Sequence, residues 1–281
     1  MGEFDSAWWK WHWAGRQGEG LKGCFPTTTA GAHAKPFLAV GLHQEYEPKR
    51  HCIVLRLPKT VEPFPAEWSL RLGDVVSNYR ASLDHLAWAL VKRGNRAGSL
   101  SEEEERRVYF PIFTSPTEFS RRAPGRLPGV RRTDLAIVRR HQPYQRGKRK
   151  LADHVLSVLN ACSNLDKHRA LQTTVVTVVE SVLTIQRAHD CIITDSGLSI
   201  VRTEPMQPGA ELGRIRVRRT GPEPRLEMNG KFGADVAIEG KTRLRQWLNE
   251  TQRFVGSLLA EFSDPPKGVI YIPPGSIAGW P

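Results

Sequence analysis

The sequence predicts an α+β fold: a helical core with an inserted antiparallel β section and a long C-terminal helix. Residues 70–91 and 241–262 repeat apolar side chains at three- and four-residue steps, which draws one buried stripe along each helix. Residues 173–185 are rich in β-branched side chains, which favours a strand. Short alternating segments continue the β pattern as far as Ile238, interrupted by turn residues such as Asp195-Ser196-Gly197.

The expected organisation is a tail followed by one domain. Residues 1–36 should form a flexible Trp/Gly-rich tail, because residues 14–34 lack periodicity and four of the eight tryptophans lie within residues 8–13. A start codon assigned too early would give the same composition. Residues 37–281 should form a single α+β domain, with a helical core at about 65–172 and 241–263 and a β section at about 173–239.

Composition narrows the class of protein. The four cysteines are far apart and form no CxxC pair, so they fit neither a zinc site nor a disulfide framework. We expect buried thiols in a reducing compartment, with Cys52 and Cys191 in the cores of strands. No run of 18 apolar residues exists and the first thirty residues hold no apolar signal region, so the expectation is a cytoplasmic protein that makes no membrane contact.

Positive charge is concentrated in one segment. Of the net charge of +12, residues 121–150 contribute +10, from eleven Lys or Arg against the single acid Asp134. Such a field favours polyanions through release of counterions, whereas the alternative is a solvated loop that aids solubility. The candidate nucleic-acid-binding residues are Arg121, Arg122, Arg131, Arg132, Arg139, Arg140, Arg149 and Lys150.

Two helical segments carry clusters of Asn, Asp, His and basic residues. At 100° per residue, Asp74, Asn78 and His85 fall within about 40° of one another on the first helix, and Arg80 and Asp84 lie four residues apart near its apolar border. The second cluster is formed by Asn160, Asn164, Asp166, Lys167, His168 and Arg169. If two antiparallel helices turned these faces together, they would enclose a pocket with two imidazoles and two carboxylates.

Four sequence blocks carry a resemblance. They are GD-x3-N-x-R-x3-DH at 73–85, FPI at 110–112, QPY at 142–144, and Leu159-Asn160 followed by DKHR at 166–169. Over about residues 50–175 the chain resembles a widespread set of uncharacterised bacterial proteins that share these blocks in this order. Arg80 to His85 also has the R-x4-H form of HEPN-type helical ribonucleases.

The HEPN resemblance implies metal-independent cleavage of RNA, with no cofactor. His85 would act as general acid or base at the ribose 2′-hydroxyl, and Arg80 would stabilise the charge on the phosphate. Arg80 and His85 lie roughly 140° apart on a helix, so such a site needs a second helix from a homodimer mate or from the His168 segment. The chain departs from the HEPN pattern at Ala81, where Asn, Asp or His is common. The candidate catalytic residues are His85, Arg80, Asn78, Asp84, His168, Asp166 and Lys167.

Two other interpretations remain open at this point. A metal centre could use Asp84, His85, Asp166 and His168, but no H-x3-H or H-E-x2-H spacing supports it. Alternatively, Arg80 and Asp84 form an ordinary helix ion pair and the Asn and His side chains are hydrogen-bonded joints between helices. The protein would then be a non-catalytic helical scaffold that binds nucleic acid or protein.

Overall fold

The chain divides into two compact units rather than one domain. The computed structural model describes residues 2–23, 43–56, 66–95, 100–147, 151–169, 171, 173–195, 199–200, 209–239 and 242–273. The helical unit comprises Met1–Lys22, Ala66–Leu171 and Arg245–Pro281, and the β unit comprises Gly23–Pro65 and Gln172–Leu244. The α+β class is confirmed, whereas the expected single domain from residue 37 onward is replaced by two units, since strands from before and after the helices assemble together.

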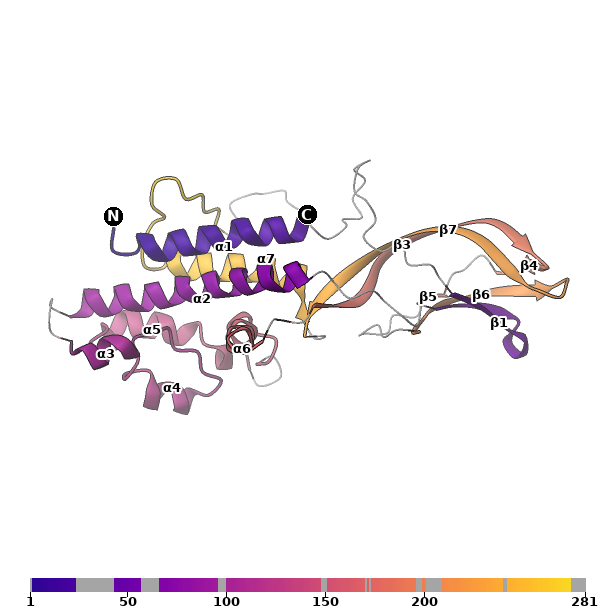
Figure 1. Cartoon of the computed structure of the whole chain (residues 1–281). Helices are drawn as coiled ribbons and strands as arrows, with labels where there is room; N and C mark the ends of the chain where they lie inside the picture. The colour runs from indigo at the N-terminus through magenta and orange to yellow at the C-terminus, as the bar shows by residue number, and fades with distance from the viewer. Residues whose placement is uncertain are drawn as a thin grey trace. The chain divides into compact units, whose positions relative to one another are not determined.

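The helical unit is built from seven α-helices and a 3-10 turn within the described residues. They are α1 (Asp5–Gly23), α2 (Ala66–Gly94), α3 (Glu102–Arg107), α4 (Pro116–Arg122), α5 (Arg132–Arg140), η2 (Pro143–Arg146), α6 (Val155–Asp166) and α7 (Leu244–Ala260). Figure 1 shows α1, α2 and α7 running alongside one another. The predicted apolar stripe of α2 is confirmed, since its members from Leu72 to Leu90 are buried.

Residues 5–23 form α1, which corrects the expectation of a flexible tail at residues 1–36; residues 24–36 lie outside the described part of the chain. Trp8 is fully buried and Trp11 nearly so. The indole Nε1 of Trp11 donates to the carbonyl oxygen of Gln252 on α7 at 2.8 Å, and Ser82 Oγ on α2 donates to the carbonyl oxygen of Ala7 at 2.8 Å. Trp8 and Trp11 are therefore core residues whose partners come from distant parts of the sequence, whereas Trp9 and Trp13 are exposed.

Local capping residues mark the positions at which several helices begin. Ser101 caps α3 and forms a capping box with Glu104. Helix α4 begins at Pro116, directly after the capping residue Ser115. Helix α6 begins at Val155 because His154 caps it: the Nδ1 of His154 accepts the Leu156 N–H at 3.1 Å.

The β unit contains two antiparallel sheets. In the first the strand order is β1-β2-β6-β4, with β5 also paired to β6; in the second it is β3-β7-β8. The bounds are β1 (His43–Glu47), β2 (Cys52–Arg56), β3 (Thr173–His189), β4 (Cys191–Ile193), β5 (Ser199–Ile200), β6 (Glu211–Arg219), β7 (Arg225–Ile238) and β8 (Thr242–Arg243), and the 3-10 turn η1 (Pro48–Arg50) joins β1 to β2. The last part of the β pattern that the sequence predicts, up to Ile238, is one long strand, β7.

The core of the β unit is formed by apolar residues from several of its strands. Ile53 and Leu55 on β2 pack with Leu212, Ile215 and Val217 of β6, with Cys191 and with Leu226. Cys52, Cys162 and Cys191 are buried free thiols, so the prediction of strand-core cysteines is confirmed for Cys52 and Cys191. No helix among the described residues is long and apolar enough to cross a membrane.

Candidate functional site

Arg80 and Asp84 on α2 both form hydrogen bonds with the backbone of Phe110. Arg80 Nη2 donates to the Phe110 carbonyl oxygen at 2.9 Å, and the Phe110 N–H donates to Asp84 Oδ1 at 2.9 Å. The two side chains also form the predicted i,i+4 ion pair, with Arg80 Nη2 and Asp84 Oδ1 2.9 Å apart. Both backbone polar groups of a fully buried residue are thereby satisfied outside any helix or strand. We call this arrangement the Phe110 clamp.

Gln142 forms hydrogen bonds with the backbone of the same extended segment, residues 110–113. Its Oε1 accepts the Phe113 N–H at 2.9 Å, and its Nε2 donates to the carbonyl oxygens of Pro111 at 2.9 Å and Val138 at 3.2 Å. Gln142 is completely buried, so these bonds replace all the water contacts of its amide. The first three sequence blocks thus meet at residues 110–113, where their polar side chains bond to backbone.

The fourth block meets the first at another point of α2. A Cβ placed on Gly73 would lie 2.4 Å from Asp166 Oδ1, so only glycine allows Asp166 to approach this closely. Ser77 also hydrogen-bonds to the Asp166 carboxylate. Partial burial and the neighbouring charge of Asp74 raise the pKa of Asp166 above its usual value.

The candidate catalytic residues are divided among different faces of α2. Asn78 faces α1, where its Nδ2 donates to Gln17 Oε1 at 2.9 Å and its Oδ1 accepts from Lys10 Nζ at 3.2 Å. Arg80 and Asp84 instead face residue 110. Asp166 touches Gly73, which precedes His85 by twelve residues, or about 18 Å along the helix axis.

The second cluster does not continue as one helical face. Helix α6 ends at Asp166 with Lys167 as its C-cap, so His168 follows the helix instead of extending the row of Asn160 and Asn164. Lys167 and His168 are exposed. His85 is only partly exposed, and its buried Nδ1 has no hydrogen-bond partner in the described structure. Within one chain, the described contacts do not bring His85 to Asp166 or His168.

The proposed metal ligands are likewise not assembled. Across the described residues, no three His, Cys, Asp or Glu side chains come close enough together to hold an ion. Asp84 already accepts from both Arg80 and the Phe110 N–H.

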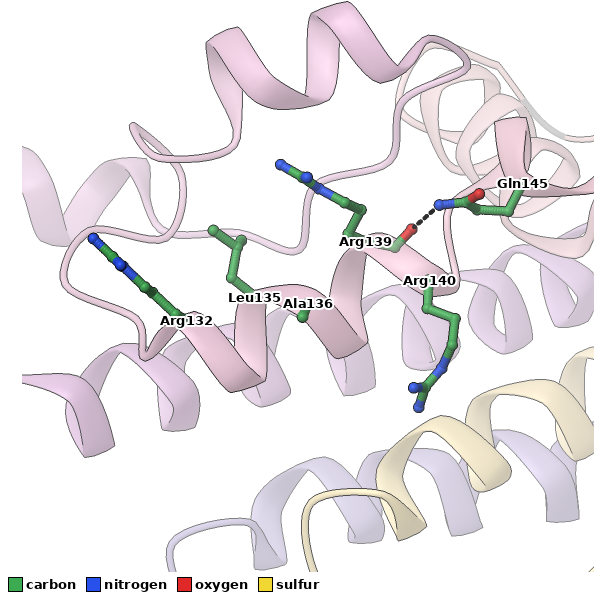
Figure 2. Close-up of a pocket in the computed structure, with 6 residues that line it drawn as sticks. All are labelled: Arg132, Leu135, Ala136, Arg139, Arg140 and Gln145. Carbon is green, nitrogen blue, oxygen red and sulfur yellow. Dashed lines mark hydrogen bonds between the residues drawn. The ribbon is translucent and has the colours of Figure 1, made fainter.

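The basic segment forms a surface groove along α5. The groove has a volume of about 410 Å³ and is lined by Arg132, Leu135, Ala136, Arg139, Arg140 and Gln145. The five α5 residues follow the spacing i, i+3, i+4, i+7, i+8, which places them on one side of the helix. Figure 2 shows Arg132 and Arg139 extending to one side, whereas Arg140 points toward α7, where it pairs with Glu261. We call this feature the α5 groove.

Among the described residues, acidic side chains neutralise only part of this surface, through Glu261 at Arg140 and Glu118 at Arg122. Asp134, a residue of α5, is 7% exposed and forms an ion pair with Arg93 of α2 at 2.8 Å. Within the described ranges, no carboxylate lies within 4 Å of the guanidinium of Arg121, Arg126, Arg131, Arg132, Arg139 or Arg146. Arg122 pairs weakly with Glu118 at 3.5 Å, while Arg149 and Lys150 lie outside the described residues.

Several of these arginines rest on aromatic rings. The Arg126 guanidinium lies 4.1 Å from the centre of the Tyr109 ring, and that of Arg139 lies 5.4 Å from the Phe119 ring. Such contacts restrict a flexible side chain and leave its N–H groups available at the ring edge. The contributions of Arg126 and Gln142 were missed as site residues, although the QPY block contains Gln142 and Arg126 belongs to the basic segment.

Comparison of the chain with family models, with curated proteins and with solved structures returns no match.

Proposed function

We propose that the protein binds single-stranded RNA through the α5 groove. The observation that supports this most directly is a row of exposed arginines in which Arg132 and Arg139 have no carboxylate within 4 Å among the described residues, while Asp134 is buried and already paired with Arg93. Binding of a polyanion by such a surface is driven by counterion release. The groove floor, formed by Leu135 and Ala136, suits the exposed faces of unpaired bases, which a duplex would bury.

The proposal treats the Arg80–Asp84 pair as structural. Both side chains bond to the buried backbone of Phe110, so moving either one to a substrate phosphate would leave a buried polar group without a partner. This arrangement favours the non-catalytic scaffold over the ribonuclease. The HEPN-like character of the helical unit and the homodimer remain predictions, which rest on the R-x4-H spacing of Arg80 and His85.

Fluorescence anisotropy with a labelled single-stranded RNA of about a dozen nucleotides tests the proposal. Arg132→Gln with Arg139→Gln removes two groove cations, and the matched control, Arg16→Gln with Arg253→Gln, removes two exposed cations from α1 and α7. Each lost phosphate contact lowers the slope of log affinity against log salt by about 0.7, so the groove variant should lose about 1.4. Equal behaviour of the groove and control variants would refute binding at the α5 groove.

The same RNA, incubated in EDTA, tests the ribonuclease prediction. We expect it to stay intact with wild-type protein. Cleavage that His85→Ala abolishes without lowering the melting temperature would instead establish a catalytic protein. Light scattering of the same sample determines whether a homodimer forms.

A further inference from the structure

The outward face of β6 in the β unit carries a second row of arginines. Along this strand Leu212, Ile215 and Val217 are buried in the core, whereas Arg216 and Arg218 are exposed. Side chains two residues apart on a strand share a face and are separated by about 6.8 Å. Within the sequence GRIRVRR at 213–219, Arg214, Arg216 and Arg218 therefore form a linear series on one face of the strand, whereas Arg219 donates to the carbonyl oxygens of Gly221 and Pro222.

The arginines of this strand differ in how they are neutralised. Arg214 makes two hydrogen bonds to the Glu211 carboxylate, at 2.5 and 2.9 Å, and also lies 3.4 Å from Glu47. These bonds lower the pKa of Glu211 and mark Arg214 as a structural residue. The side chains of Arg216 and Arg218, in contrast, make no hydrogen bond or ion pair with other residues that the structure describes.

The strand neighbours enlarge this basic surface. Arg216 is paired in register with Cys52, next to the η1 turn, whose Lys49 and Arg50 are both exposed; Arg50 forms an ion pair with Glu47 at 3.7 Å. Arg218 is paired with Ile192, which is 47% exposed. Arg216 and Arg218, which have no ion-pair partner in the described structure, therefore lie beside an exposed apolar side chain, that of Ile192.

We propose that Arg216 and Arg218 form a second binding site, for the phosphate backbone of an extended single strand of nucleic acid. A row that follows one strand matches a linear polyanion, and phosphate contacts of this kind come mostly from Arg and Lys. Ile192 beside Arg218 offers apolar contact to a sugar or base. This site belongs to the β unit and is independent of the α5 groove, which belongs to the helical unit.

Full-length protein carrying Arg216→Gln and Arg218→Gln tests the proposal by anisotropy with the same labelled single-stranded RNA. The matched control is Arg187→Gln with Arg225→Gln, which removes two exposed arginines from the other sheet of the β unit. Loss of two phosphate contacts should lower the slope of log affinity against log salt by about 1.4. Between 1 M and 0.1 M salt, the affinity of the variant should therefore rise about 25-fold less than that of the wild type. The control should retain the wild-type slope.

The outcomes separate this proposal from the α5 groove. If the β6 variant binds like its control while the α5 variant is weakened, the second site does not exist and the groove stands. If only the β6 variant is weakened, the second site stands and the groove is refuted. Binding to phosphatidylserine vesicles without binding to RNA, or equal competition by duplex and single strand, would overturn the proposed ligand.

Discussion

Substitution of Asp84 distinguishes a structural from a catalytic role for the Arg80–Asp84 pair of α2. Asp84→Ala removes the acceptor of the buried Phe110 N–H, which costs about 1–3 kcal/mol. It also removes the ion-pair partner of Arg80, whose side chain is 15% exposed, at a cost of about 1 kcal/mol. The expected loss of stability is therefore about 2–4 kcal/mol. Asp84→Asn retains an acceptor oxygen and should cost about 1 kcal/mol.

Urea unfolding monitored by tryptophan fluorescence gives the free energy of unfolding of the helical unit, since Trp8 and Trp11 lie in its core and all eight tryptophans belong to it. Because the chain holds two compact units, unfolding need not be a single transition. Hydrogen exchange at the Phe110 amide therefore supplies the local measurement, and it should accelerate strongly in Asp84→Ala.

The matched control lies on the same helix. Glu67 and Arg71 form another i,i+4 ion pair, but both side chains are at least half exposed and neither is bonded to a distant backbone group in the described structure. Glu67→Ala should cost at most about 0.5 kcal/mol. If Asp84→Ala costs no more than this and the Phe110 amide still exchanges slowly, the Phe110 clamp is not a stabilising feature.

Three further changes have definite expected outcomes. Gln142→Ala leaves the Phe113 N–H without its acceptor in a buried site and should lower stability by about 2–4 kcal/mol in thermal denaturation. Burial, reinforced by nearby positive charge, lowers the pKa of His154 to about 4, so the unfolded chain binds this proton more readily. Stability should then fall by roughly 2–3 kcal/mol as the pH drops from about 6.5 to about 4, and His154→Asn, which keeps a capping acceptor, should remove this dependence of the urea midpoint. Gly73→Ala should destabilise the wild type, because its Cβ collides with Asp166, but stabilise an Asp166→Ala background by about 0.5–1 kcal/mol; the same sign in both would contradict the contact.

Local sequence signals determined the long elements and the local polar pairs. Three features depend only on neighbours a few residues away: the apolar period of α2, the β-branched run of β3 and the Ser101 cap. Such features can be predicted from the sequence without knowledge of the tertiary structure. The Arg80–Asp84 pair is of the same kind, because four residues bring both side chains to one side of any helix.

Only the tertiary structure decided what those residues contact. Helix α1 is rich in Gly and Trp and has no clear apolar period; Trp11 is ordered by Gln252, which lies 241 residues away in the sequence. Phe110 likewise meets Arg80 and Asp84 across 30 and 26 residues, which turns a local ion pair into a clamp on backbone. Helical periodicity specifies which residues share a face but not what packs against it, because that depends on contacts between segments distant in the chain.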